Sequence, residues 1–186
     1  MFEYAFTIGQ DSHRLIEKKD SILMLGGYPL HGDLAFEANS DGDVFYHALT
    51  NAISGITGRN ILGDIADHLC LEKGIRDSRV YLEEALCDLR RGLPNNSSKS
   101  SEIRMTVNGI QVSAWELRNI SFSVECRKPH LSGVIPQVKE SIAKVVGILP
   151  ASVGITATTG EGLSDCGKGL GIMVFCCCTF RRNVCE

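Results

Sequence analysis

The chain has 186 residues, 44% of them hydrophobic and 22% charged, which is ordinary for a globular domain that buries a core. Its net charge of -3 argues against general nucleic-acid binding, which depends on a basic surface. The first residues lack the basic start and apolar run of a signal peptide, and no apolar stretch approaches the roughly 18 residues of a membrane span. We therefore expect a cytoplasmic protein that binds neither nucleic acid nor a membrane.

The 8 cysteines lack the spacing of a disulfide framework or of a cysteine-rich zinc site. Five are scattered, residues 176–178 are consecutive within an apolar run, and the sequence contains no C-x-x-C pair. We expect reduced thiols that are buried as small hydrophobic side chains.

Hydrophobic periodicity and turn residues predict the elements of the first half of the chain. In order, they are strands at 4–9 and 21–26, an irregular or weakly extended segment at 30–39, a helix at 41–58, a loop region at 61–74 and a helix at 77–91. The first strand is expected to run into a loop that carries Asp11 and His13. Ser40 or Asp41 can cap the first helix, and this helix start either serves only as a cap or also approaches a phosphate.

The second half begins with a turn-rich segment of low complexity at 93–101. The elements expected after it are a hairpin of 104–107 and 110–112 around Asn108-Gly109, a strand at 120–125, a helix at 131–146, a strand at 153–157 and a long buried strand at 169–180. Strands and helices mix without strict alternation, which predicts an α+β fold, a mixed β-sheet with helices packed on one face.

Asp11, His13 and His47 form a candidate metal site. Asp11 and His13 are two residues apart, so in an extended segment their side chains point to the same face. His47 lies on the predicted helix, four residues after Asp43. One carboxylate and two imidazoles, with a further position left open, suit catalytic zinc. Each residue alone fits a surface hydrogen bond or a packed histidine equally well, so the interpretation depends on the surrounding motifs.

Several short motifs occur in a fixed order along the chain. They are Gly-Gln-Asp-Ser-His at 9–13, Leu-Gly-Gly at 25–27, Ser-Asp-Gly-Asp-Val at 40–44, His47-Ala48, Gly-Asp-Ile at 63–65, Asp77-Ser78, Pro136-Gln137, Ala-Thr-Thr-Gly-Glu at 157–161 and Gly-Lys-Gly-Leu-Gly-Ile at 167–172. Together they resemble the 2-C-methyl-D-erythritol 2,4-cyclodiphosphate synthases of the non-mevalonate isoprenoid pathway. The resemblance covers a single domain, 1–186, except for a mobile hairpin insertion at about 93–118.

The resemblance implies a homotrimer with active sites at the subunit interfaces. Its reaction cyclises 4-diphosphocytidyl-2-C-methyl-D-erythritol 2-phosphate to 2-C-methyl-D-erythritol 2,4-cyclodiphosphate and releases CMP, as a metal-dependent phosphorus-oxygen lyase. The 2-phosphate attacks the β-phosphorus of the same molecule, so catalysis is mostly positioning and charge neutralisation. The resemblance also implies a central channel of the trimer that an anionic isoprenoid ligand could occupy.

The resemblance further implies roles for individual residues. Asp11, His13 and His47 match the zinc ligands, and Glu161 matches the ligand of a second cation, Mg2+ or Mn2+. Asn39 and Thr159 occupy the catalytic positions. The substrate-binding positions are Asp11, His13, Asn39, Ser40, Asp64, Ala66, Cys126, Pro129, His130, Leu131, Ser132, Thr158, Thr159, Gly160, Glu161, Asp165 and Lys168. Within this set, Asp64 matches the carboxylate that binds the erythritol hydroxyls, and residues 126–132 match the loop that holds the cytidine.

The chain departs from the family pattern at Asn39, His130 and Leu170. The family usually has histidine, lysine and glutamate at these positions, and Lys168 replaces an arginine. These departures leave two alternatives open, a non-catalytic or regulatory trimeric binding protein of the same fold and a different metal-dependent phosphoesterase. His68 is an alternative ligand to His47, which we favour because it occupies the helix position that the motif requires.

Overall fold

The computed structural model describes residues 1–91, 104–107 and 110–185. Its elements are β1 (Phe2–Leu25), β2 (Tyr28–Phe36), α1 (Val44–Thr57), α2 (Asp64–Asp67), a π-helical turn (His68–Glu72), α3 (Ser78–Arg91), β3 (Arg104–Val107), β4 (Ile110–Ser113), β5 (Glu116–Glu125), α4 (Ile135–Val146), a 3-10 turn (Pro150–Ser152), β6 (Val153–Thr158), a second 3-10 turn (Gly160–Gly162) and β7 (Gly171–Cys185).

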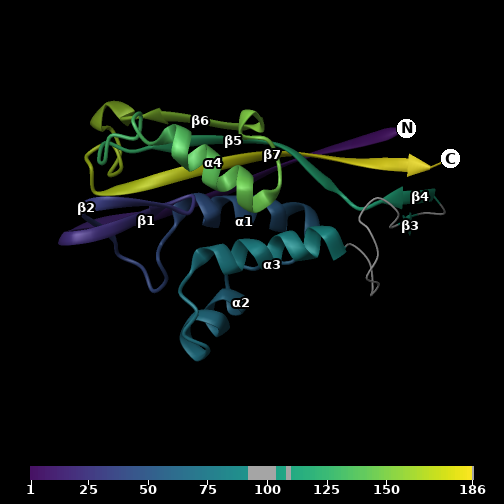
Figure 1. The fold of residues 1–186 in the computed structure, drawn as a ribbon, viewed down its shortest axis with the longest axis horizontal. Helices are drawn as coiled ribbons and strands as arrows, with labels where there is room; N and C mark the ends of the chain where they lie inside the picture. Colours follow the sequence, from purple (N-terminus) through teal and green to yellow (C-terminus); the bar gives the residue numbers. More distant parts are fainter. Residues whose placement is uncertain (92–103, 108–109, 186) are drawn as a thin grey trace.

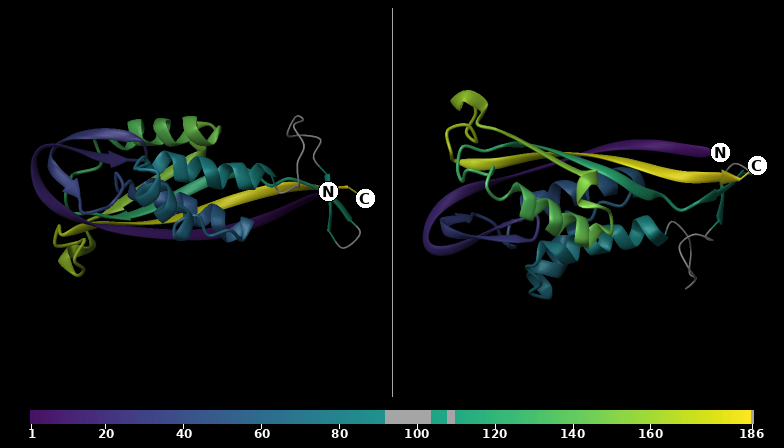
Figure 2. Two further views of the ribbon diagram at one scale, coloured as in Figure 1. Left: turned by 90° about the horizontal axis from the view of Figure 1, so that it is seen from below. Right: turned by 45° about the horizontal axis from the view of Figure 1, so that its top comes forward.

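The 7 strands within these residues form one sheet, in which β2, β1, β7, β4 and β3 follow one another and β5 pairs with both β7 and β6. The β5–β6 pair is parallel and the other pairs are antiparallel, so the sheet is mixed. Helices α1, α3 and α4 lie on one side of it, with α3 packed on α1 (Figures 1 and 2). The predicted α+β fold, with helices on one face of a mixed sheet, is confirmed.

The β1 strand is continuous, so the prediction of two strands separated by a loop at Asp11 and His13 was wrong. Its first half pairs with β7 and its second half with β2. The prediction of an irregular segment at 30–39 was also wrong, because β2 occupies most of that segment and pairs with β1. Both errors have one cause: pairing with another strand, β7 for the first half of β1 and the second half of β1 for β2, orders segments that show no local strand pattern.

Other element boundaries shift by a few residues. Helix α1 begins at Val44 rather than at residue 41, and Asp43, not Ser40 or Asp41, caps it. The loop region at 61–74 contains α2 and the π-helical turn. The two strands of the predicted hairpin pair as expected, while 93–101 and Asn108-Gly109 lie outside the described residues. This hairpin extends the sheet beside the end of β7, where Trp115 packs against its own subunit under the Arg182 guanidinium.

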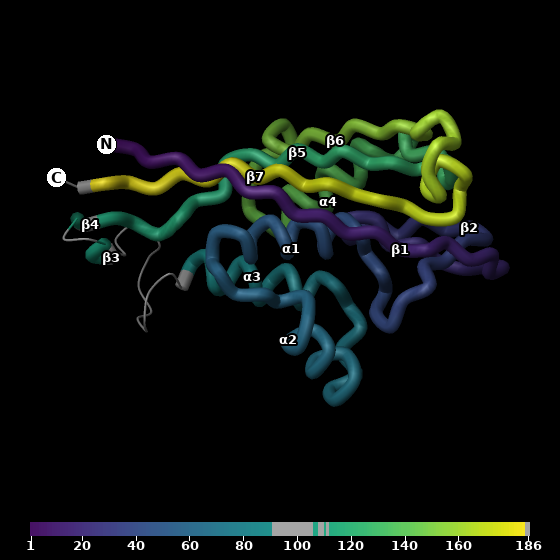
Figure 3. Tube along the Cα trace, turned by 180° about the vertical axis from the view of Figure 1, so that it is seen from behind, coloured from purple at the N-terminus to yellow at the C-terminus, as the bar shows by residue number. Residues whose placement is uncertain are grey.

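The two faces of β1 differ sharply. Gly9 and Leu15 face the helices and are buried, whereas Tyr4, Phe6 and Ile8 point to the opposite face, where Phe6 is 75% and Ile8 64% exposed. Figure 3 shows this side, with β1 and β7 in front and both chain ends at one end of the sheet. The described chain therefore exposes an apolar sheet face that its own helices do not cover.

The cysteines agree in part with the expectation of buried thiols. The seven whose side chains the structure describes are free, and Cys126, Cys176 and Cys178 are buried. Cys177 is exposed on the uncovered sheet face. Within the described residues, the helices are too short or too polar to span a bilayer.

Candidate metal centre and substrate-binding cavities

Helix α1 crosses β1 at Gly9. A Cβ atom on Gly9 would lie 2.1 Å from the carbonyl oxygen of Ala48 and 2.3 Å from the nitrogen of Ala52. Only a glycine lets the helix backbone come this close to the strand. The crossing brings His47, one residue before Ala48, beside Asp11, two residues after Gly9.

Asp43 fixes the start of α1 against the turn between β1 and β2. Its carboxylate accepts hydrogen bonds from the backbone N–H groups of Gly26 at 2.8 Å, Gly27 at 2.6 Å, and Phe45 and Tyr46 at 3.2 Å. Burial raises the pKa of Asp43, and although the Gly27 and Gly26 N–H groups oppose this effect, the pKa reaches about 6. The helix that carries His47 is thus anchored at its first turn.

Asp11, His13 and His47 converge on one point, as the sequence predicted. The three atoms Asp11 Oδ2, His13 Nε2 and His47 Nδ1 form a triangle with all sides 3.1 Å. Tetrahedral ligands held about 2.0–2.1 Å from a zinc ion lie about 3.3–3.4 Å apart, so the triangle needs little adjustment to hold one. Three donors on one side of such an ion leave a position open toward the cavity.

The electrostatics of the triangle favour an ionised carboxylate. Burial alone would raise the pKa of Asp11, but the side-chain hydrogen bonds and charges of His13 and His47 outweigh it and lower the pKa to about 2. His68 does not approach this group. It pairs with Glu72 at 2.8 Å on an exposed turn, so the structure brings His47 and not His68 to Asp11 and His13.

One further residue, Ser78, contacts the triangle from behind, and Asp41 contacts Ser78 in turn. The sequence reasoning included neither among the site residues. The Oγ atom of Ser78 lies 2.8 Å from His47 Nε2, and it also hydrogen-bonds the carboxylate of Asp41. Asp77-Ser78 was noted as a motif, but the contact with His47 spans 31 positions and depends on how α3 packs on α1.

The triangle lies at the wall of a cavity of about 650 Å³. This first cavity is also lined by the predicted site residues Asn39, Ser40 and Ala66, and by Asn51, Cys70 and Tyr81. Asp64 is exposed at the start of α2, next to the lining residue Gly63. The thiol of Cys70 donates to the carbonyl oxygen of Asn39 at 3.5 Å.

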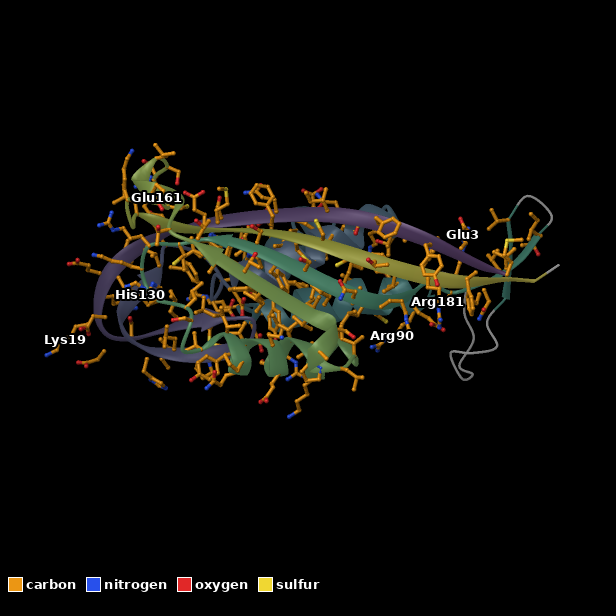
Figure 4. All side chains as sticks on the ribbon, turned by 90° about the horizontal axis from the view of Figure 1, so that it is seen from above. Glu3, Lys19, Arg90, His130, Glu161 and Arg181 are labelled. Atoms are coloured by element: carbon orange, nitrogen blue, oxygen red, sulfur yellow. The ribbon has the colours of Figure 1, made fainter. Side chains whose placement is uncertain are left out.

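A second cavity of about 750 Å³ lies where the loops after β5 and β6 meet. Predicted residues Pro129, His130, Thr159 and Glu161 line it, together with Leu34, Arg127, Lys128 and Gly162. Figure 4 shows His130 and Glu161 at the same end of the molecule. Arg127 and Lys128 were not predicted individually, although they lie within 126–132, and their charges suit an anionic ligand.

The two cavities share no lining residue in the part of the chain that the structure describes. The candidate zinc ligands line the first cavity, whereas Thr159 and Glu161 line the second. Glu161 has a left-handed backbone, with φ 51°, which is unusual for a residue with a side chain. Within one chain, the two predicted metal-binding groups therefore line different cavities.

The remaining predicted residues differ in what they offer to a ligand. Cys126 and Leu131 are buried, and the Cys126 thiol donates to the carbonyl oxygen of Lys128 at 2.8 Å. Thr158 Oγ1 accepts the N–H of Gly160 at 3.1 Å. Asp165 and Lys168 form an exposed ion pair at 3.2 Å, and Ser132 is exposed. Burial leaves Cys126 and Leu131 only their backbone groups for contact with a ligand.

Sequence comparisons identify relatives along nearly the whole chain. The model of the YgbB family matches residues 4–97 and 93–181. A 2-C-methyl-D-erythritol 2,4-cyclodiphosphate synthase of Chlamydia trachomatis (serovar L2b, strain UCH-1/proctitis) is 39% identical over 180 residues, which are 96% of this chain and 89% of that protein. The synthase of Chlamydia muridarum is 40% identical over 177 residues, 95% of this chain and 87% of that protein.

Solved structures share the fold. The bifunctional IspDF of Campylobacter jejuni superposes with a TM-score of 0.75 and 26% identity over 97% of this chain, which spans only 43% of that longer chain. The synthase of Plasmodium vivax superposes with a TM-score of 0.70 and 20% identity, over 96% of this chain and 97% of that chain. From its motifs, its relatives and its fold, this chain belongs to the YgbB family, that of the 2-C-methyl-D-erythritol 2,4-cyclodiphosphate synthases.

Proposed function

We propose that this protein is an active cyclodiphosphate synthase. It converts 4-diphosphocytidyl-2-C-methyl-D-erythritol 2-phosphate to 2-C-methyl-D-erythritol 2,4-cyclodiphosphate and releases CMP, in the cytoplasm, as a step of isoprenoid precursor synthesis. The observation that carries the proposal is the triangle of Asp11, His13 and His47 at the wall of a cavity, in a chain 39% identical to a synthase.

The triangle would hold zinc, because one carboxylate and two imidazoles with an open fourth position are a donor set typical of catalytic zinc. Glu161 would hold the second cation, Mg2+ or Mn2+, since carboxylate oxygens suit these hard ions. Divalent ions bound at these positions would polarise the phosphoryl oxygens and neutralise their charge. The protein would then be a metal-dependent phosphorus-oxygen lyase.

The other residues bind and orient the substrate in this proposal. The loop at 126–132 holds the cytidine, and Arg127 and Lys128 add positive charge beside it. Asp64 accepts hydrogen bonds from the erythritol hydroxyls. The Asn39 amide and the Thr159 hydroxyl are donors that fix phosphoryl oxygens for the attack by the 2-phosphate. A homologous structure from Plasmodium falciparum is a CDP complex, which supports a cytidine nucleotide as the ligand of this fold.

A homotrimer would complete the site. The first cavity of one subunit and the second cavity of its neighbour would together enclose the substrate, since one chain keeps the two apart. The apolar sheet face with Phe6 and Ile8 exposed is a suitable contact surface between subunits, because a large exposed apolar patch marks an interaction site. A central channel of such a trimer could hold an anionic isoprenoid, which Lys168 would attract.

A non-catalytic binding trimer is the second candidate. The observation that favours it is Asn39, which lines the first cavity where the family usually has histidine and which brings no charge to a phosphate. In the same way, His130 lines the second cavity where the family usually has lysine, so the positive charge at this position is no longer fixed.

Incubation of the purified protein with the cytidyl substrate, zinc and magnesium decides between the two. CMP release with the cyclic diphosphate as co-product, stopped by a chelator and restored by added metal, is the expected result. Folded protein that binds zinc and CDP but releases no CMP would favour the binding trimer. Hydrolysis of simple phosphate esters, measured in parallel, would instead identify a phosphoesterase.

A further inference from the structure

His47 uses both of its ring nitrogens. Nδ1 lies 3.1 Å from both Asp11 Oδ2 and His13 Nε2, on the side where a metal would bind. Nε2 lies 2.8 Å from Ser78 Oγ on the opposite side. His47 is 8% exposed and Ser78 is 0% exposed, and the bond between them is buried, so water does not compete for it.

The partners of Ser78 determine the direction of its hydrogen bonds. A carboxylate only accepts, so the single hydroxyl proton of Ser78 is donated to Asp41. The Ser78 oxygen then has only lone pairs left for His47, and Nε2 must carry the proton that lies between them. The neutral ring with its proton on Nε2 has its free lone pair on Nδ1, which faces Asp11 and His13.

Asp41 is itself held in place. Its N–H donates to the carbonyl oxygen of Arg76 at 2.8 Å, and its carboxylate accepts the backbone N–H groups of Ser78 at 3.2 Å and Asp43 at 3.1 Å. These bonds join the start of α1 to the start of α3. The hydroxyl of Ser78 is therefore presented to His47 from a fixed point.

We propose that Asp41 and Ser78 are positioning residues that hold His47 in its Nε2–H form, with Nδ1 directed at the metal. This inference deepens the proposed zinc site and rests on it. A histidine ligand is oriented by the partner of its other nitrogen, and loss of such a partner weakens metal binding by roughly 10- to 100-fold. A purely structural role, joining α1 to α3, is the competing explanation.

Zinc affinity separates the two explanations. Competition with a chromophoric chelator is measured for the wild type, Ser78→Ala and Asp41→Ala, and we expect zinc binding to weaken roughly 10- to 100-fold in Ser78→Ala. Because Asp41 acts through Ser78, the double variant should bind zinc about as well as Ser78→Ala alone. Unchanged affinity in a folded Ser78→Ala protein would overturn the proposal.

Matched control variants distinguish a specific loss of zinc affinity from a loss that follows from lower protein stability. Ser21→Ala deletes another buried serine hydroxyl, which bonds the carbonyl oxygens of Gly32 and Leu34, and Asp77→Asn alters the other aspartate at the start of α3. Both should leave zinc affinity unchanged. A loss as large in Ser21→Ala as in Ser78→Ala would contradict the proposal. If Ser78→Ala does not fold, Asp41→Ala, which removes the acceptor of the Ser78 proton, decides, and unchanged affinity in it overturns the proposal.

A spectroscopic measurement tests the proton position without any metal. In the metal-free wild type, at a pH where the ring is neutral, long-range 1H–15N correlations of the histidine rings should show His47 protonated on Nε2, and Ser78→Ala should mix the two neutral forms. A wild-type proton on Nδ1 would overturn the inference even if zinc binds. A correct proton position in a protein that fails to bind zinc would instead reject the proposed zinc site.

Discussion

Gly9 and Ala48 meet backbone to backbone, since a Cβ atom on Gly9 would lie 2.1 Å from the Ala48 carbonyl oxygen. The Gly9→Ala variant must push α1 away from β1, which carries His47 away from Asp11. We expect a loss of about 1–3 kcal/mol in the free energy of unfolding, typical of overpacking, together with weaker zinc binding. Denaturant titration and zinc analysis measure the two effects. Gly32→Ala is the matched control, because a Cβ there meets nothing within 4 Å.

Asp43 should make stability depend on pH. Its folded pKa of about 6 lies above the ordinary value of 3.8 for an aspartate, so between these values the native state binds more protons than the unfolded state. The contribution of Asp43 to the free energy of unfolding is therefore fully present below pH 4 and is lost as the pH rises through 6. Asp43→Asn does not titrate, so the stability advantage of the wild type over it should shrink from pH 4 to pH 7, by an amount on the order of 3 kcal/mol. Denaturant titrations across this range measure it, and a gap that widens with pH would contradict the assigned pKa.

Replacement of a candidate ligand should abolish zinc binding. His47→Ala leaves only Asp11 and His13, so its affinity should fall by more than the roughly 10- to 100-fold expected when a ligand loses its own hydrogen-bond partner. Metal content and CMP release should fall together. His68→Ala is the control, and a loss of zinc in that variant would restore His68 as a ligand.

Asn39→His should raise activity if the missing charge limits the reaction. Hydrogen bonds from a charged donor are roughly twice as strong as neutral ones, and a gain of about 1.4 kcal/mol in the transition state is about tenfold in rate. The measurement is kcat for CMP release. Asn183→His, at an exposed position near the end of β7, should leave kcat unchanged. An equal rate in Asn39→His and the wild type would mean that the histidine is dispensable here.

Ile8→Glu tests whether the apolar sheet face joins subunits. A charge at this 64% exposed position should dissociate the assembly to monomers in light scattering and abolish CMP release. Zinc content per chain should remain, because one chain supplies all three candidate ligands. Leu149→Glu, 72% exposed, is the matched control. A trimer that survives Ile8→Glu would place the interface elsewhere.

The sequence predicted the features that depend on local patterns. Helix α4 and strand β6 follow from periodicity, and the i, i+2 spacing of Asp11 and His13 places both side chains on one face of an extended segment. The family prediction is confirmed by relatives about 39% identical. The structure confirms that Asp11, His13 and His47 come together, and the roles of all single residues stay predictions.

Features that depend on contacts between different elements could not be predicted in this way. Strand β2 exists because β1 pairs with it, and its own sequence, with Pro29 and Gly32, shows little strand pattern. The contact between Ser78 and His47 arises only when α3 packs on α1. Arg127 and Lys128 become site residues because a loop after β6 closes the second cavity beside them.

The pairing of the two chain ends has a practical consequence. The amino group of Met1 donates to the carbonyl oxygen of Val184 at 3.0 Å. The start of β1 and the end of β7 therefore lie side by side, at the end of the molecule opposite to His130 and Glu161 (Figure 4). A short peptide could bridge the two ends, and new termini could then be opened at the exposed irregularity of β1 around Lys19 and Asp20, where the register with β2 shifts. A tag or a second folded unit attached to either end of this chain would extend away from the second cavity.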